Sequence, residues 1–319
     1  MIQKRKLFQT LVTEIGLGCW QLGGDWGEVS DAEALEILRA SHEAGVRFLD
    51  TAAGYGAGRS ERLIGQFLKE QSEAVFVATK IGRKEASEAH LRTGVENSLQ
   101  RLGVETLDLI QLHCWTMEHL RQHVVWETLR DLQKEGKIRQ FGASVESVEE
   151  ARFCMAQEGM VSLQIIFNLF RQHPRDEFFA EAQAKGVALI VRVPLASGLL
   201  SGKFCAETRF GAGDHRNYNK DGAAFHVGET FGGLTFEKGL ELVEQLKSLL
   251  PGEPPLAALA LRWILDHDAV TTVIPGASSI RQAVANAEAS RLPALPVELH
   301  QKLAEFYRNQ VAPHVRGQY

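Results

Sequence analysis

At residues 47–61 the chain reads RFLDTAAGYGAGRSE, which passes from a short apolar strand through a loop of small residues into a helix. Asp50 stands at the end of the strand, where packing alone would favour an apolar side chain. The loop carries a single large side chain, Tyr55, and its small residues would let the backbone approach a ligand closely. Taken alone, the stretch fits an ordinary strand-to-helix turn equally well, with Asp50 as a buried structural anion.

Two later strands end in ionisable residues in the same way. The apolar run at residues 75–79 is followed by Lys80, and the run at 107–113 ends in His113. A lone histidine at a strand end is structural about as often as functional. Ionisable side chains are rarely buried unless they are paired, so packing does not readily explain three of them at successive strand ends, with a tyrosine close by.

Strands and helices alternate along the chain. We expect strands at 15–18, 47–50, 75–79, 107–113, 138–143, 163–167, 188–191 and 270–274. We expect helices at 31–44, 60–70, 87–102, 125–135, 148–157, 178–185, 236–250, 256–265, 280–287 and 297–309. Short apolar strands that alternate with helices are typical of a closed parallel sheet. The pattern predicts an α/β fold, a (β/α)8 TIM barrel that forms a single domain over residues 1–319.

Two segments depart from this alternation. Residues 6–18 are expected to form two short strands that turn near Gln9 and Thr10 and lead into the first barrel strand. The segment 196–234, which follows the seventh strand, has no regular pattern and carries Lys203, Arg209 and Arg216. A loop of that length inside a compact domain is usually functional or mobile.

The composition excludes several classes of protein. The chain is 45% hydrophobic with a net charge of -5. No apolar run approaches the roughly 20 residues that span a bilayer, no signal-peptide segment follows the first residues, and no long basic stripe supports nucleic-acid binding. The cysteines are too scattered for a metal site or a disulfide framework. We therefore expect a soluble, cytoplasmic protein without a metal site. Its oligomeric state is left open.

Motifs spread over nearly the whole chain point to a known family. They are Phe48-Leu49-Asp50-Thr51-Ala52, Gly54-Tyr55-Gly56, Ser60-Glu61, Ala78-Thr79-Lys80, Gln111-Leu112-His113, Gly142-Ala143-Ser144, the run from Pro194 to Lys203, and Val273-Ile274-Pro275-Gly276-Ala277-Ser278. Together they resemble the aldo-keto reductases. The resemblance implies a catalytic tetrad of Asp50, Tyr55, Lys80 and His113. It also implies that the hairpin closes the bottom of the barrel and that the long loop folds over a cofactor.

The chemistry of these four residues is consistent with carbonyl reduction. A phenol with an ordinary pKa of about 10 donates protons poorly at neutral pH, and we expect the Lys80 ammonium to lower the pKa of Tyr55. Asp50 would keep Lys80 protonated, and His113 would donate a hydrogen bond to the carbonyl oxygen. We therefore predict an NAD(P)H-dependent oxidoreductase that interconverts an aldehyde, ketone or sugar and its alcohol, with Tyr55 as general acid and base.

The cofactor would lie in the loops at the barrel mouth, because no Gly-x-Gly-x-x-Gly motif follows the first strand. The resemblance places the carboxamide at Ser144 and Gln164. Arg209 or Arg216 would reach a phosphate, and the sequence does not decide between them. The full set of expected cofactor contacts is Trp20, Asp50, Ser144, Gln164, Arg192, Pro194, Leu195, Ser197, Lys203, Arg209, Gly276, Ser278, Gln282 and Asn286.

Some positions differ from the family pattern. Arg192 aligns with the tyrosine or tryptophan that commonly stacks on the nicotinamide ring, and its charge would change the electronic environment of the ring. Gly276 and Gln282 stand where many members carry Lys and Arg for the 2′-phosphate of NADP, and Arg281 is a candidate substitute. NADP remains the expected cofactor, with NAD as the alternative.

Other functions remain open at this point. A regulatory or sensor subunit that binds cofactor but turns over slowly, like the potassium-channel β subunits of this superfamily, would keep all four residues. A metal-dependent barrel hydrolase lacks the further ligands it would need. If the loops point as in the family, Trp20, Trp26, Cys114 and Trp115 line a pocket for a sugar face or a planar carbonyl. The physiological substrate and the favoured direction of reaction are not set by the sequence.

Overall fold

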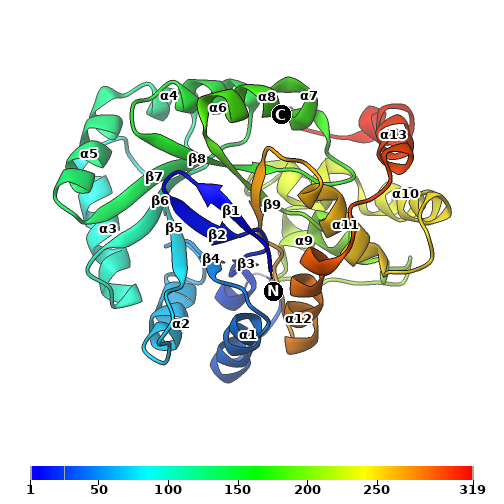
Figure 1. Ribbon diagram of the computed structural model, residues 1–319, viewed down its shortest axis with the longest axis horizontal. Coiled ribbons are helices and arrows are strands. Elements are labelled where there is room, and N and C mark those ends of the chain that lie inside the picture. The colour runs from blue at the N-terminus through cyan, green and yellow to red at the C-terminus, as the bar shows by residue number, and fades with distance from the viewer. Residues whose placement is uncertain (1, 25, 318–319) are drawn as a thin grey trace.

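The protein folds into a closed parallel barrel surrounded by helices (Figure 1). The computed structural model describes residues 2–24 and 26–317. The parallel strands follow one another around an eight-stranded sheet in chain order, from β3 (Leu17–Gly18) to β10 (Val270–Val273). Bridges from Ile15 to Val273 and from Gly18 to Gly276 join the first barrel strand to the last. The predicted (β/α)8 fold is therefore confirmed.

The remaining elements follow the expected alternation. The other strands are β1 (Lys4–Leu7), β2 (Thr10–Thr13), β4 (Phe48–Asp50), β5 (Phe76–Gly82), β6 (Leu107–His113), β7 (Ile138–Ser144), β8 (Met160–Ile166) and β9 (Ala188–Arg192). The α-helices are α1 (Asp31–Glu43), α2 (Arg59–Leu68), α3 (Glu88–Leu102), α4 (Met117–Leu120), α5 (His123–Lys134), α6 (Val148–Met155), α7 (His173–Glu177), α8 (Phe179–Lys185), α9 (His215–Tyr218), α10 (Phe236–Leu249), α11 (Leu256–Leu265), α12 (Ile280–Glu288) and α13 (Val297–Phe306). Shorter helical turns are η1 (Gln21–Gly23), η2 (Ala196–Ser201), η3 (Val227–Glu229), η4 (Phe231–Gly233), η5 (Ala289–Arg291), η6 (Tyr307–Val311) and η7 (Ala312–His314).

The structure differs from the sequence expectations mainly at element ends. The hairpin lies at Lys4–Thr13, earlier than expected, because its first strand is an exposed, charged run without an apolar signal. Strand β8 begins at Met160 rather than at residue 163, across an irregularity in its pairing with β7. The short helices α4 and α7 lie inside segments that we expected to be loops.

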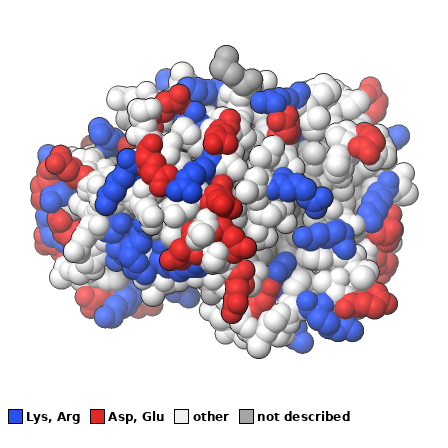
Figure 2. Space-filling model, turned by 90° about the horizontal axis from the view of Figure 1, so that it is seen from below, with Lys and Arg blue, Asp and Glu red and all other residues white. Residues whose placement is uncertain are grey.

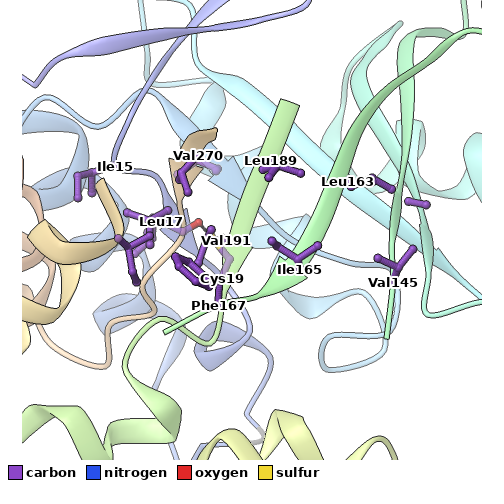
Figure 3. Close-up of a cluster of buried hydrophobic side chains, with 14 of the residues drawn as sticks. Ile15, Leu17, Cys19, Val145, Leu163, Ile165, Phe167, Leu189, Val191 and Val270 are labelled. Carbon is purple, nitrogen blue, oxygen red and sulfur yellow. Dashed lines mark hydrogen bonds between the residues drawn. The ribbon is translucent and has the colours of Figure 1, made fainter. Parts of the chain in front are cut away.

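Side chains alternate between the inside of the barrel and the layer under the helices, since a strand has a period of two. Phe48, Ala78, Leu109 and Ile190 belong to one interior cluster. The outer layer forms a second cluster together with residues of the helices, and Figure 3 shows part of it, including Leu163, Ile165, Leu189, Val191 and Val270. The alternation means that a polar residue two or four places after an interior apolar residue faces the barrel axis.

The hairpin closes one end of the barrel. Strands β1 and β2 pair antiparallel, and Figure 1 shows them lying across the barrel. Leu7 and Val12 are buried in the interior cluster together with Phe48, Phe76 and Ala188, the first residues of their strands. Burying each of these hairpin side chains contributes about 2 kcal/mol. The amino-terminal end of the barrel is therefore filled, and the carboxyl ends of the strands form the open end.

Serine residues begin several of the surrounding helices. Ser30 accepts a hydrogen bond from the backbone N–H of Glu33, whose carboxylate in turn accepts from the Ser30 backbone N–H. This reciprocal pair satisfies two helix donors that otherwise lack partners. The same serine cap, without the return bond, begins α3, α6 and α12 at Ser87, Ser147 and Ser279.

The irregular segment after β9 is fastened to the rest of the fold by arginines. Arg171 is buried and donates to the backbone carbonyls of Gly232, Arg316 and Gly317. Arg316 donates to the carbonyl of Leu234 and forms an ion pair with Asp221. The last described residues of the chain therefore hold the segment in place.

Charges of both signs are interspersed on the face shown in Figure 2. Such a mixture gives no extended field of one sign that would steer a polyanion towards this face. In the described part of the chain, every helix is too short or too polar to cross a membrane.

Candidate active site

The carboxyl ends of β4, β5 and β6 bring Asp50, Lys80 and His113 to the open end of the barrel. Each lies an even number of positions after an interior apolar residue of its strand, so it faces the barrel axis. The Lys80 Nζ lies 2.5 Å from Asp50 Oδ1 and donates to the Thr51 carbonyl at 2.8 Å. Both charged side chains are buried, so each depends on the other for its charge to be tolerated.

The second carboxylate oxygen of Asp50 accepts from two glutamines. Gln111 Nε2 donates at 3.1 Å and Gln164 Nε2 at 2.7 Å. Gln164 Nε2 also donates to Gln111 Oε1 at 3.3 Å. These bonds satisfy the carboxylate and fix the amide of Gln164, whose nitrogen faces Asp50. The Gln164 Oε1 is then the atom that can accept from a ligand amide. Sequence reasoning gave Gln111 no role, although it lies two residues before His113.

Tyr55 reaches the buried lysine from the loop after β4. Its hydroxyl oxygen accepts from Lys80 Nζ at 3.2 Å, which leaves the phenolic hydrogen free to point elsewhere. The phenol ring meets His113 edge-to-face with centroids 5.8 Å apart, and it stacks on Trp20 at 5.8 Å and 17°. All four predicted catalytic side chains are therefore brought together.

Two glycines let the loop of Tyr55 approach the loop that carries Trp20. Gly56 has a φ of +58°, which favours glycine, and a Cβ at this position would lie 2.4 Å from the Gly23 carbonyl oxygen. A side chain at either residue would push the loops apart and change the position of the phenol.

Burial dominates the protonation of the site. Burial raises the pKa of Tyr55 to about 12, although the Lys80 ammonium acts to lower it. The expectation that Lys80 gives a net decrease is therefore wrong for the free protein. Burial is the largest single influence on the pKa of Lys80 and lowers it, but the charge and hydrogen bonds of Asp50 and Tyr55 together outweigh burial and raise the pKa to about 12. Burial and the charge of Lys80 hold the pKa of His113 well below its usual range. At neutral pH the phenol is protonated, the amine is charged and the imidazole is neutral.

A cavity of about 640 Å³ opens above the tetrad. Its lining includes Asp50, Tyr55 and His113 as well as Ser278 and Asn286. This volume lies in the usual range for a site that binds a small molecule or cofactor.

Most of the expected cofactor residues line this cavity. They are Trp20, Asp50, Gln164, Arg192, Pro194, Leu195, Ser197, Lys203, Gly276, Ser278, Gln282 and Asn286. Ser144 is buried outside the lining, with its hydroxyl 3.8 Å from the Sγ of Cys114, which does line the cavity. The guanidinium of Arg209 is exposed, donates to the carbonyls of Ala206 and Thr208, and lies outside the lining. Arg216, the other candidate, does line the cavity.

The lining around Gly276 and Ser278 includes the uncharged polar side chains of Gln21, Gln282 and Asn286. The side-chain amide of Gln21 lies directly over Gly276, where a Cβ would be 2.0 Å from Gln21 Nε2. Gln282 Oε1 accepts from the backbone N–H and the hydroxyl of Ser278. Gln21 therefore occupies the space in which a side chain at residue 276 would begin. Sequence reasoning did not find Gln21, because glutamine in a loop carries no recognisable signal.

Rings from the long loop pack against Trp20 and Trp26 of the cavity lining. His215 packs against Trp20 and Trp26, with ring centroids 4.8 and 4.2 Å apart, and Phe225 meets Trp20 at 5.7 Å. The Arg216 guanidinium lies 5.0 Å from the Trp26 ring. The expectation that the segment 196–234 folds over the site therefore agrees with these contacts.

Trp115 does not line the cavity, contrary to expectation. Cys114 has a φ of 54°, which turns the chain at the end of β6. The indole Nε1 of Trp115 then donates to the Ile81 carbonyl at 2.9 Å, and its ring is buried in the outer layer. Of the four residues expected to line the pocket, Trp20, Trp26 and Cys114 do so.

Arg192 and Glu229 form an ion pair in the cavity wall, with Arg192 Nε 2.7 Å from Glu229 Oε1. The pair joins β9 to the covering loop. Sequence reasoning identified Arg192 but not Glu229, because a glutamate in an irregular segment has no spacing that marks it.

Comparison with known proteins identifies the family. The family model named Aldo/keto reductase family matches residues 14–308. The chain belongs to the aldo/keto reductase family. Aldo-keto reductase YhdN of Bacillus subtilis is 30% identical to it over 86% of this chain and 84% of its own length. Aldo-keto reductase str7 of Strobilurus tenacellus is 32% identical over 94% and 91%. The structure of the glycerol dehydrogenase AKR11B4 from Gluconobacter oxydans matches with a TM-score of 0.81 and 25% identity, covering 99% and 98% of the two chains.

Membership of the aldo/keto reductase family makes this protein an oxidoreductase. Within residues 2–24 and 26–317 of this aldo/keto reductase, no three His, Cys, Asp or Glu side chains gather in a way that could hold a metal ion. A barrel hydrolase of the kind considered above therefore has no donor set in the described residues.

Proposed function

We propose that this aldo/keto reductase interconverts a small aldehyde, ketone or sugar and its alcohol, using a nicotinamide dinucleotide and Tyr55 as proton donor and acceptor. The observation that carries the proposal is the sequence of contacts from Asp50 through Lys80 to Tyr55, at the floor of a cavity of about 640 Å³. Of these three residues, Asp50 and Tyr55 line the cavity, and Tyr55 carries the hydroxyl group. A proton held there can be passed to a carbonyl oxygen.

The cavity lining fits a nicotinamide dinucleotide. Gln164 Oε1 can accept from the carboxamide, because the side-chain nitrogen is committed to Asp50. Lys203 and Arg216 supply positive charge for the phosphates, and the polar residues around Ser278 suit the adenosine. We propose NADP, with NAD as the alternative. Arg281 lies outside the described lining, so a contact with the 2′-phosphate would require its side chain to turn inwards.

The protein groups have distinct roles in the proposed reaction. The bound dinucleotide supplies the hydride. Tyr55 holds the carbonyl oxygen by a hydrogen bond and gives up its phenolic proton to it. Lys80, kept charged by Asp50, stabilises the phenolate that Tyr55 becomes, from 3.2 Å away. His113 is neutral and can donate a second hydrogen bond to the same oxygen.

The protonation of the site predicts how activity depends on pH. Reduction needs the protonated phenol, which is lost as pH rises through the folded-state pKa. Because burial raises the pKa of Tyr55 to about 12, this loss comes only at strongly alkaline pH. We expect kcat/KM for reduction to be level between about pH 6 and about pH 8, where an unperturbed histidine or a strongly acidified phenol would titrate. Steady-state assays at constant ionic strength check this, and a clear decline within that range would contradict it.

Binding and turnover together test the proposed function. Fluorescence titration with NADPH and NADH should show saturable binding, followed by turnover with a panel of aldehydes, ketones and sugars. A turnover number of about 1 per second or more with at least one substrate is expected of an enzyme. Tight cofactor binding with negligible turnover across the panel would instead support the regulatory or sensor subunit. Failure to bind either dinucleotide would refute both functions.

The two loop arginines give a matched pair of variants. Arg216 lines the cavity, held by Asp214 and packed on Trp26, whereas Arg209 lies outside the lining. We expect Arg216→Ala to raise the Kd for NADPH about tenfold, the usual effect of losing one charge-assisted hydrogen bond, and Arg209→Ala to change it by less than about twofold. Fluorescence titration measures both. The reverse order would assign the phosphate to Arg209.

Several broader expectations remain proposals. We propose that the chain forms a single domain and that its partners are small carbonyl or sugar molecules, not nucleic acid or membranes. We also propose a cytoplasmic location. The four cysteines support it, since Cys19, Cys114, Cys154 and Cys205 are all free thiols. Fluorescence microscopy of a tagged chain would test the location.

A further inference from the structure

The ion pair between Arg192 and Glu229 is held rigidly in the cavity wall. Besides the bond to Glu229, Arg192 Nη1 donates to the carbonyls of Val145 at 3.1 Å and Gln164 at 3.0 Å. The two charged side chains are 9% and 11% exposed. Three directed bonds at a nearly buried site leave the guanidinium one position, so its charge acts from a fixed point.

Glu229 is fixed from its own side as well. Its backbone carbonyl accepts from the Ser197 hydroxyl at 2.8 Å, and the same hydroxyl accepts from the Phe231 backbone N–H at 3.1 Å. Ser197 belongs to η2, at the start of the covering segment, so these bonds hold the part of the segment around Glu229 against the part that follows β9. The carboxylate therefore stays beside the guanidinium.

The charge of Arg192 lies within range of the reaction centre. A carbonyl oxygen that contacts Tyr55 and His113 places the carbonyl carbon in this part of the cavity, and hydride transfer requires the nicotinamide ring within about 3.5 Å of that carbon. Arg192 Nη2 lies 4.0 Å from Cys114 Sγ, in the residue after His113. After burial and Lys80, the charge of Arg192 is the next cause that lowers the pKa of His113. The field of Arg192 thus reaches the site where the ring must lie.

The nicotinamide ring changes charge during the reaction. It is neutral when reduced and carries a unit positive charge when oxidised. A neighbouring guanidinium therefore disfavours the oxidised form, and a neighbouring carboxylate favours it. Glu146 also lines this wall, and burial raises the pKa of its carboxyl.

We propose that the Arg192–Glu229 pair sets the relative affinity of this site for the oxidised and the reduced cofactor. The inference rests on the proposed function, in that a nicotinamide dinucleotide binds here. Arg192 raises the ratio of the Kd of the oxidised form to the Kd of the reduced form, and Glu229 lowers it. The two residues of one ion pair thus act on this ratio in opposite directions.

Two single variants test the proposal by equilibrium binding, without turnover. Glu229→Gln keeps a hydrogen bond to Arg192 but removes the offsetting charge, so the ratio of Kd(NADP⁺) to Kd(NADPH) should rise about tenfold. Arg192→Gln removes the positive charge, so the ratio should fall about tenfold. Calorimetry measures the Kd of both forms, and fluorescence titration provides a second measurement of the Kd of the reduced form. The same pair of measurements with NAD⁺ and NADH covers the alternative cofactor.

A third variant separates the effect of the Arg192 charge on the Kd ratio from the effect of fastening the covering loop. Arg192→Lys keeps the positive charge but loses the planar fork that binds Glu229 and two carbonyls. It should weaken binding of both cofactor forms. The ratio of Kd(NADP⁺) to Kd(NADPH) should stay within about threefold of the original, because the charge is unchanged. If the ion pair only fastens the loop, each of the three variants would raise the Kd of the oxidised and the reduced cofactor by the same factor. That result would overturn the proposal. If the original protein binds neither form, the proposed function itself fails; binding with unchanged ratios refutes the inference alone.

Discussion

Replacing Tyr55 by phenylalanine is expected to lower kcat for carbonyl reduction about a hundred- to ten-thousand-fold, the usual contribution of a general acid. The ring and its packing against Trp20 and His113 would remain, because only the hydroxyl is removed. The Kd for NADPH should stay within about twofold, since an interaction needed only in the transition state adds little to ground-state binding. Steady-state kinetics and fluorescence titration measure the two quantities.

A second tyrosine provides the control for this variant. Tyr307 is buried in η6, away from the cavity lining. Tyr307→Phe also removes one phenolic hydroxyl, and it should leave kcat within about twofold. Equal losses in the two variants would point to general destabilisation. Full activity of Tyr55→Phe would remove Tyr55 from the role of proton donor.

Replacing Lys80 by methionine is expected to affect both stability and activity. The variant leaves Asp50 buried without its cation, and breaking one partner of a buried ion pair costs about 3–5 kcal/mol of unfolding free energy. The two glutamines that donate to Asp50 would offset part of this loss. Turnover should fall as well, because Tyr55 loses the charge that stabilises its phenolate. Urea unfolding, read with two spectroscopic probes, measures the free energy of unfolding.

The double variant Asp50→Asn with Lys80→Met separates the two effects. Removing both charges should recover most of the lost stability, because no uncompensated buried charge remains. Turnover should stay low, since the amine beside Tyr55 is still missing. A double variant as unstable as Lys80→Met alone would show that packing of the lysine side chain, not the charge of Asp50, determines the loss.

Much of the site could be predicted because strand periodicity fixes which way a residue points. Once Phe48 and Ala78 are recognised as interior, Asp50 and Lys80 must face the same axis, and parallel strands bring their carboxyl ends together. The position of Tyr55 follows less directly. It depends on the close approach of Gly56 to Gly23, which can be seen only when the two loops are placed.

Contacts between segments far apart in the chain could not be predicted from the sequence. Glu229 meets Arg192 across 37 positions of chain, and nothing in the irregular segment marks it as a partner. Trp115 is expected in the cavity if the loops point as in the family, but the turn at Cys114 directs it into the outer layer. The phosphate contact could not be assigned between Arg209 and Arg216 for the same reason.

The pKa of Tyr55 shows that a neighbouring charge alone does not predict the direction of a pKa shift. The lysine beside the phenol was expected to dominate, since the motif suggests their proximity. How deeply the phenol is buried depends on Trp20 and the covering loop, which the motif does not describe. Burial proves to be the larger cause, so the free protein holds the phenol protonated.

The fastening of the covering loop by Arg316 also bears on how the protein should be handled. The carbonyls of Gly317 and Gly232 both accept from Arg171, so the last described residue and the covering segment share one guanidinium. A purification tag or fluorescent fusion at the carboxyl terminus could disturb these contacts and loosen the segment that carries Glu229. The hairpin lies at the opposite, filled end of the barrel. Fusions for binding work, and attachment to a sensor surface, therefore belong at the amino terminus.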